Sequence, residues 1–205
     1  MQSLTLRGLD EDELPAAAVV LGDAMRDNPL HLRAFGEDPD RRERALRRLF
    51  ESVLRRVWRK GYVEGALLDG RLVGVCGRLA PGNCRATLVE RLAFLPALKK
   101  GNSWTTVVRV FGWAGAWSKR DPDAPHWHLG PLGVLREEQG KGVGRRLLAS
   151  FCARMDAERA GAYLETDTEA NVRMYEKRGF TVVAREDVIG APCWFLSRPP
   201  APPGA

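Results

Sequence analysis

Long apolar runs and paired cysteine motifs are absent from this 205-residue sequence. No stretch approaches the roughly 18 consecutive apolar residues that a membrane-spanning helix needs, and residues 1–7 do not have the pattern of a secretory signal. The four cysteines are widely separated and form no C-x-x-C pair, which argues against a zinc knuckle: Cys76, Cys84, Cys152 and Cys193. These absences predict a cytoplasmic protein with reduced thiols.

Hydrophobic residues make up 44% of the chain, which is enough for one well-packed domain. We expect this single domain to span residues 1–197 and the proline-rich segment 198–205 to be disordered. No internal repeat is visible, so the domain is not built from repeated units.

A glycine-rich loop between residues 139 and 146 is the most distinctive pattern in the chain. An apolar strand leads into it and an amphipathic helix leaves it. Glycine lets a backbone approach a phosphate closely, and a helix start adds unpaired N–H donors and the positive end of its dipole. Lys141, Arg145 and Arg146 add positive charge. We therefore predict a phosphate-binding loop, with an ordinary strand-to-helix connection as the competing interpretation.

Two common kinds of phosphate loop do not fit this segment. Gly142 stands after Lys141, where a P-loop needs Ser or Thr to hold magnesium. The dinucleotide pattern G-x-G-x-x-G/A is not matched either. Without a magnesium ligand, we expect a phosphorylated carrier that is held rather than hydrolysed.

A second pattern follows on a short predicted helix. Asn171 and Tyr175 are four residues apart, which places them on one helix face. Gly179, just before Phe180, is a suitable residue to follow the end of that helix.

Together the two patterns resemble the GNAT superfamily of acyl-CoA-dependent N-acyltransferases. Gln139-x-x-Gly142-x-Gly144 is similar to its pyrophosphate loop, and residues 171–180 are similar to its second signature. The resemblance covers roughly residues 126–197, and within it residues 127–129, 164–166 and 175–180 look most like the puromycin N-acetyltransferase-type branch.

This resemblance implies a single α/β domain with a central, mixed, partly splayed sheet of six to seven strands flanked by helices. It implies acetyl-CoA as the cosubstrate, bound by residues of about 126–197. Helices within about 10–60, and an insert at about 87–120, would form the acceptor side. The residues it assigns to cofactor binding are Leu132, Gly133, Val134, Gln139, Gly140, Lys141, Gly142, Val143, Gly144, Arg145 and Asn171. Asn171 also suits a helix N-cap.

Residue patterns predict the elements that such a domain needs. Helical spacing is found over 12–26, 39–60 and 144–160, and one or two further helices are expected within 87–120. A hairpin is expected around Asp69-Gly70, between strands at 62–68 and 71–79. A strand at 127–135 contains Gly130, Pro131 and Gly133, which is typical of a bulge.

Acyl transfer to an amine requires proton transfers, because an alkylammonium with a pKa near ~10 must lose a proton before it attacks. Glu165 at a strand end and His128 are the candidate bases, and an unnamed residue or a water chain is the third possibility. The resemblance assigns Tyr175 as the acid that protonates the leaving thiolate, whereas its alternative role is to pack the helix on the sheet.

His126 and His128 form an H-x-H pair on one strand face. No third ligand is evident in the sequence, so we expect no metal site.

The basic charge is concentrated between Arg41 and Lys60, where eight Arg and one Lys accompany only Glu43 and Glu51. This segment is either a solvated helix face above a core stripe or a surface for an acidic partner. No nucleic-acid-reading motif accompanies it, so we expect neither a nucleic-acid nor a membrane partner.

Two functions from different classes remain open. The first is an N-acetyltransferase that acts on a primary amine, preferably of a small molecule, with protein N-termini or lysines as a variant. The second is an acyl-CoA-sensing or acidic-partner-binding module without turnover. The presence of both Tyr175 and Glu165 favours the enzyme. A monomer and a homodimer are equally compatible with the sequence.

Overall fold

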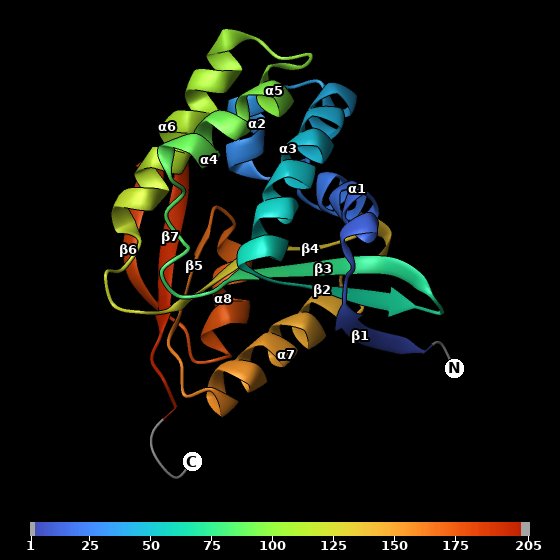
Figure 1. Cartoon of the computed structure of the whole chain (residues 1–205), viewed down its shortest axis with the longest axis vertical. Helices are drawn as coiled ribbons and strands as arrows, with labels where there is room; N and C mark the ends of the chain where they lie inside the picture. Colours follow the sequence, from blue (N-terminus) through green and yellow to red (C-terminus); the bar gives the residue numbers. More distant parts are fainter. Residues whose placement is uncertain (1–2, 202–205) are drawn as a thin grey trace.

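A computed structural model describes residues 3–201, which form a seven-stranded sheet with helices on both faces (Figure 1). The strand order is β1-β2-β3-β4-β5-β7-β6, and β4 and β5 are the parallel pair in an otherwise antiparallel sheet. The strands are β1 (Leu4–Gly8), β2 (Gly61–Leu68), β3 (Arg71–Leu79), β4 (Trp127–Val134), β5 (Ala162–Thr166), β6 (Thr181–Val188) and β7 (Ala191–Arg198). The predicted mixed sheet is therefore confirmed, with seven strands.

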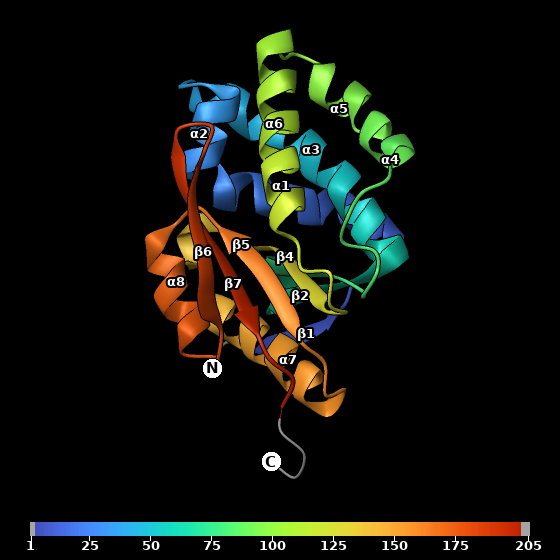
Figure 2. The same cartoon turned by 90° about the vertical axis from the view of Figure 1, so that its left-hand side faces the viewer.

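Eight α-helices are found in the described residues. They are α1 (Leu14–Met25), α2 (Pro29–Phe35), α3 (Pro39–Lys60), α4 (Leu88–Ala93), α5 (Leu95–Lys99), α6 (Trp104–Arg120), α7 (Val143–Ala157) and α8 (Glu169–Glu176). Helices α1 and α3 pack on one face of β2 and β3, and α7 covers the opposite face (Figure 1). Helix α6 stands over the other half of the sheet, beside α2 (Figure 2). None of the helices within residues 3–201 is long and apolar enough to cross a membrane.

Helix α3 has a basic sequence, but a side-chain cap and an apolar stripe place it against the core. Asp38 caps its first turn by accepting a hydrogen bond from the N–H of Arg41 at 3.0 Å. Its apolar stripe is buried against α1: Ala45, Leu46, Leu49, Phe50, Leu54 and Val57.

The cations of α3 pair within the protein. Arg42 is buried and bonded to Asp27 at 2.7 Å, Lys60 meets Glu90 at 2.6 Å, and Arg55 pairs with Glu51 at 2.7 Å. Much of the basic charge is thus matched by carboxylates of the same chain, which supports the interpretation of α3 as a core helix with a charged outer face.

Strand β4 separates from β5 after a short parallel contact. Only Trp127 pairs with Ala162 and His128 with Tyr163. On its other side β4 stays paired with β3 through Val134, apart from the predicted bulge, where the register shifts between Cys76 and Arg78. The sheet is therefore open between the end of β4 and β5.

The segment between β3 and β4 differs from the prediction of one or two helices. Three helices, α4, α5 and α6, occupy it. Thr87 and Ser103 begin α4 and α6 by accepting hydrogen bonds from backbone N–H groups of the first turn, and Pro96 lies in the first turn of α5. Short helices of this kind are set by local capping signals that the overall apolar pattern of the segment does not reveal.

Two predicted boundaries also require correction. The single helix predicted over 12–26 begins with a 3-10 turn at Glu11–Glu13, and Asn28-Pro29 ends one helix and begins another, α2. At the other end, Arg198 belongs to β7, where it pairs with Asp156 at 2.7 Å, so the predicted disordered tail starts at least one residue too early. Residues 202–205 of that predicted tail lie outside the described residues.

Asp167 joins the end of β5 to the start of α2. Its buried carboxylate accepts a hydrogen bond from the backbone N–H of Leu30 at 2.8 Å and from Asn28 Nδ2 at 3.3 Å. One residue therefore fixes a helix of the first half of the chain to a strand of the second half.

Replacing Asp167 should destabilise the fold. In Asp167→Ala the buried N–H of Leu30 loses its acceptor, and we expect the free energy of unfolding to fall by about 1–3 kcal/mol in urea denaturation. The matched control is Asp187→Ala, because Asp187 also accepts a backbone N–H at 2.8 Å, from Gly190, but at an exposed turn. Equal losses in the two variants would contradict the anchoring role of Asp167.

Candidate active site

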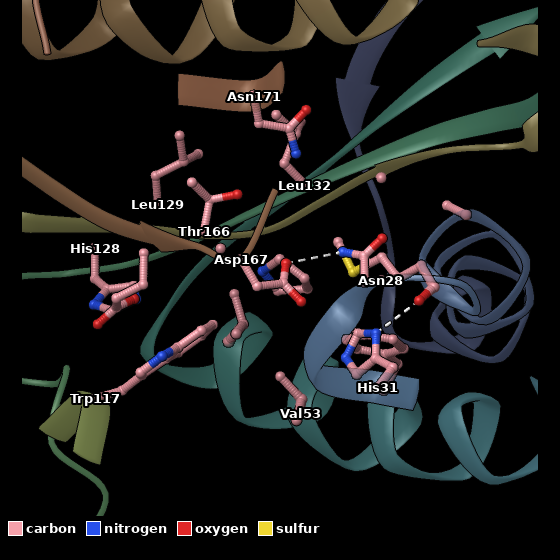
Figure 3. A pocket seen from close by; sticks show the side chains of 18 of the residues that line it. Asn28, His31, Val53, Trp117, His128, Leu129, Leu132, Thr166, Asp167 and Asn171 are labelled. Atoms are coloured by element: carbon pink, nitrogen blue, oxygen red, sulfur yellow. Dashed lines mark hydrogen bonds and ion pairs between the residues drawn. The ribbon is translucent and has the colours of Figure 1, made fainter. Parts of the chain in front are cut away.

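A cavity of about 840 Å³ lies where the open part of the sheet meets the helices. Figure 3 shows part of its lining, with Leu132 and Asn171 in one region and His128 beside Trp117 in another. Thirteen of the fourteen predicted site residues line this cavity: His128, Leu132, Gly133, Val134, Gln139, Gly140, Gly142, Val143, Gly144, Arg145, Glu165, Asn171 and Tyr175.

The glycine-rich loop has the backbone geometry that a phosphate cradle needs. Gly140 and Gly142 adopt φ of 77° and 91°, and a Cβ at Gly140 would meet nothing within 4 Å. Gly142 is the N-cap of α7, and the first intrahelical hydrogen bond of that turn runs from Arg146 to Gly142. The preceding N–H groups of the helix are therefore directed toward the loop.

Side chains around the loop hold it in place. Gln139 Nε2 donates to the carbonyl of Val134 at 3.0 Å, which ties the loop to β4. The guanidinium of Arg145 lies over Gly142, 3.6 Å from the place where a Cβ would be. Lys141 is the exception among the predicted residues, because its Nζ pairs with Glu138 at 3.0 Å and it does not line the cavity.

Strand β4 presents backbone groups to the gap beside β5. The N–H of Leu135 donates to Val73 of β3 at 2.9 Å. Because successive N–H groups point to opposite edges of a strand, the N–H of Val134 points away from β3, toward the gap. A ligand in extended conformation could pair with β4 there as an added strand.

Asn171 and Tyr175 both lie on the cavity side of α8. The N-cap of this helix is Thr168, so the alternative role of Asn171 as N-cap is wrong. Tyr175 is buried and packs against Phe180, with ring centroids 5.9 Å apart. Burial raises the pKa of its phenol, so the hydroxyl keeps its proton at neutral pH.

The two candidate bases lie in contact with each other. His128 Nε2 is 3.1 Å from Glu165 Oε2, and the Glu165 side chain is only 3% exposed. His128 is held on its other side by Asp121, whose Oδ1 is 3.6 Å from Nδ1. The imidazole therefore has a carboxylate at each ring nitrogen, and both His128 and Glu165 line the cavity.

Asp121 and Cys84 are site residues that sequence reasoning missed. They complete a group of four with His126 and His128, whose ligand atoms all lie within 4.8 Å of one another. The structure thus brings to the H-x-H pair two further side chains of ligand type that were not evident in the sequence. Asp121 lies near in sequence to His126, but Cys84 is brought there by the fold alone.

The charges of this group affect one another. Desolvation alone would lower the pKa of His126, but its hydrogen bond to Asp121 and its contact with Cys84 raise it to about 10. Burial opposes the charged form of Asp121, yet the two imidazoles hold the pKa of its carboxyl well below its usual range.

The opposite part of the cavity is apolar and aromatic. Side chains from α1, α3, α5 and α6 line it: Met25, Leu49, Phe50, Val53, Leu98, Val110, Phe111, Trp113 and Trp117. Asn28, His31 and Asp167 are the polar residues nearby (Figure 3). In the sequence, this lining is indicated only by the helical spacing of apolar residues in α3 and by Asp167, which follows a strand. Neither pattern distinguishes residues that line a pocket from residues that fill a hydrophobic core.

The sequence profile of the acetyltransferase (GNAT) family matches residues 27–180, which is most of the chain. The chain belongs to this family. It is therefore an acyl-CoA-dependent acetyltransferase, and acetyl-CoA is its cosubstrate.

Solved structures show the same fold. A Corynebacterium glutamicum protein described as histone acetyltransferase HPA2 and related acetyltransferase is 24% identical, with a TM-score of 0.74 and 99% of each chain covered. The polyamine N-acetyltransferase of Drosophila melanogaster is 14% identical, with a TM-score of 0.59 and coverage of 96% of this chain and 100% of that chain. The PaiA N-acetyltransferase of Thermoplasma acidophilum, in complex with coenzyme A, has the same identity and TM-score, with coverage of 96% and 99%.

The residues of this acetyltransferase fit acetyl-CoA. The open glycine cradle at the start of α7 suits the pyrophosphate, and the unpaired edge of β4 suits an amide-containing arm. Gln139, Gly142 and Gly144 of the expected loop all line the cavity.

Filling the cradle should weaken cofactor binding. Gly142→Asp places a side chain in a left-handed conformation and a negative charge beside the expected phosphates, so we expect Kd for acetyl-CoA to rise by about tenfold or more in calorimetric titration. Gly70→Asp is the matched control, since Gly70 has φ of 84° and open space in the distant β2–β3 turn. Unchanged affinity in Gly142→Asp would mean that the loop does not hold the cofactor.

Proposed function

We propose that this acetyltransferase moves an acetyl group from acetyl-CoA to the primary amine of a small molecule with an apolar or aromatic body. The proposal rests on the composition of the cavity lining, which combines aromatic side chains with buried carboxylates. Its aromatic part, lined by Phe50, Trp113 and Trp117, adjoins the buried carboxylates of Glu165 and Asp167. An apolar body would be buried there while its ammonium group meets a carboxylate.

Glu165 is the proposed base. Its carboxylate lines the cavity, and of the two ring nitrogens of His128, Nε2 faces Glu165 and Nδ1 faces Asp121. His128 would then position Glu165 by donating from Nε2, and Glu165 would receive the proton of the acceptor amine. This assignment retains both predicted residues but gives them different roles.

Acetyl-CoA, when bound, supplies an acetyl group activated as a thioester. The N–H of Val134, directed into the gap beside β4, would donate to the carbonyl oxygen of that group and stabilise the charge it gathers. Tyr175, which keeps its proton, would deliver it to the departing sulfur. Asn171 would contact the arm of the cofactor from α8.

Proteins of similar fold are acetyltransferases that act on acceptors of different sizes. The relatives include a polyamine N-acetyltransferase and an agmatine N-acetyltransferase, but also a ribosomal-protein-S18-alanine N-acetyltransferase. The lining that α5 and α6 contribute supports a small acceptor here, because its apolar and aromatic side chains suit a small apolar body.

The competing function is binding without turnover. Steady release of CoA with a primary amine, followed with a thiol reagent, would support the enzyme. Tight binding of acetyl-CoA and CoA without thiol release across a set of aromatic and aliphatic amines would favour the binding module.

Removing the phenolic hydroxyl should slow turnover. We expect Tyr175→Phe to reduce kcat by about ten- to a thousand-fold with little change in acetyl-CoA affinity, because only the proton donor is lost. Tyr62→Phe, which changes a tyrosine that stacks on Arg78 outside the cavity, is the control and should retain full activity. Unaltered kcat in Tyr175→Phe would assign this residue to packing alone.

Removing the carboxylate should affect the other proton transfer. Glu165→Gln keeps the shape of the side chain and an acceptor for His128, yet we expect kcat to fall by about a hundredfold or more. Glu176→Gln, on the exposed side of α8, serves as the control. Comparable rates for Glu165→Gln and the unmodified enzyme would leave the base to a water chain.

A further inference from the structure

Three separate segments bring metal-ligating side chains to one point beside the cavity. Cys84 lies in the loop that leaves β3, Asp121 directly follows α6, and His126 and His128 flank Trp127, the first residue of β4. Their sulfur, carboxylate and imidazole ligand atoms all lie within 4.8 Å of one another. One thiolate, one carboxylate and two imidazoles form a ligand set that suits zinc.

The spacing of these atoms is compatible with tetrahedral coordination. Asp121 Oδ1 is 3.2 Å from His126 Nε2 and 3.6 Å from His128 Nδ1. Ligand atoms bound at ~2.0–2.3 Å from a zinc ion lie roughly 3–4 Å apart in a tetrahedron. His128 Nδ1 is buried and has no hydrogen-bond partner in the part of the chain that the structure describes.

The outer ring nitrogens of both histidines are oriented by protein acceptors. His126 Nδ1 lies 2.8 Å from the carbonyl of Ala124, and His128 Nε2 lies 3.1 Å from Glu165. A proton on each of these outer nitrogens leaves the inner nitrogen, Nε2 of His126 and Nδ1 of His128, free to bind a metal. Backbone carbonyls and carboxylates are the partners that orient metal-binding histidines in this way.

Charge balance also favours a divalent ion. A thiolate at Cys84 and the carboxylate of Asp121 carry two negative charges, and the imidazoles are neutral when they bind a metal. Asp121 is buried, and its second oxygen lies 3.4 Å from Arg85 Nε, so Oδ1 is the oxygen directed to the histidines. One Zn²⁺ would neutralise these two ligand charges in a site where Asp121 and His126 are buried and Cys84 and His128 are partly buried.

We propose that Cys84, Asp121, His126 and His128 bind a structural zinc ion. The ion would join the two ends of the α4–α6 insert, at Cys84 and Asp121, to strand β4. It would also fix the imidazole that contacts Glu165, and thereby hold the acceptor side of the cavity in shape. With four protein ligands the site is closed, so the ion has no open position for a substrate.

Metal binding can be measured without acetyl transfer, so its outcome is independent of the proposed function. The protein is stripped with a chelator, titrated with Co²⁺ and Zn²⁺, and compared with two thiol-deletion variants, Cys84→Ala and Cys152→Ala. Cys152 lies in α7, outside the cluster, and is the matched control. We expect one equivalent of Co²⁺ with a thiolate-to-cobalt charge-transfer band, and a Tm that rises with zinc.

In Cys84→Ala the charge-transfer band should disappear and zinc affinity should fall by more than the ~10–100-fold that loss of an outer-shell partner costs. Cys152→Ala should retain both properties. Absence of saturable binding at one equivalent, or equal zinc affinity in the two variants, would overturn the proposal.

A measurement on the unmodified chain covers the case in which Cys84→Ala does not fold. Alkylation of each cysteine is followed by peptide mass spectrometry with and without one equivalent of Zn²⁺. Zinc should selectively slow the modification of Cys84. If zinc leaves alkylation of Cys84 unchanged, the four residues are an internal hydrogen-bonded cluster only.

Discussion

The separation of β4 from β5 is the constraint on which the rest of this structure depends. The two strands pair only at Trp127 and His128, and beyond this point β4 remains bonded to β3 alone. Because β4 separates from β5, the edge of β4 that faces β5 has backbone N–H and C=O groups without a partner strand within residues 3–201. Such groups need hydrogen-bond partners. The gap places the N–H of Val134, the start of α7 and the helix that carries Tyr175 around one cavity. In the proposed mechanism, cofactor binding and acetyl transfer therefore depend on the same opening.

The apolar part of the cavity is built by elements far from the glycine-rich loop in sequence. Helices α1–α3 and the α4–α6 insert line one part of the cavity with apolar and aromatic side chains. Asp167 connects α2 to the end of β5, so the carboxylates at the strand ends and the helices above them are held together. The basic helix α3 takes part through its buried stripe, while many of its arginines pair with nearby carboxylates.

His128 connects the chemistry of the cavity with the cluster behind it. One ring nitrogen meets Glu165 and the other faces Asp121. A side chain held from both sides loses rotational freedom, which is what a precisely placed base requires. The proposed zinc ion would extend this arrangement, because it would fix the imidazole through a coordinate bond in addition to its contacts with Asp121 and Glu165.

The sequence by itself determined the elements whose signals are local. The glycines of the loop, the spacing of Asn171 and Tyr175, and the Asp69-Gly70 hairpin all specify short segments, and the resemblance that these patterns carry implied a mixed sheet of six to seven strands. Only the tertiary structure decided which residues meet across the cavity. Cys84 and Asp121 are brought together by the path of three intervening helices. Such contacts depend on distances between distant segments, which residue spacing along a chain does not encode.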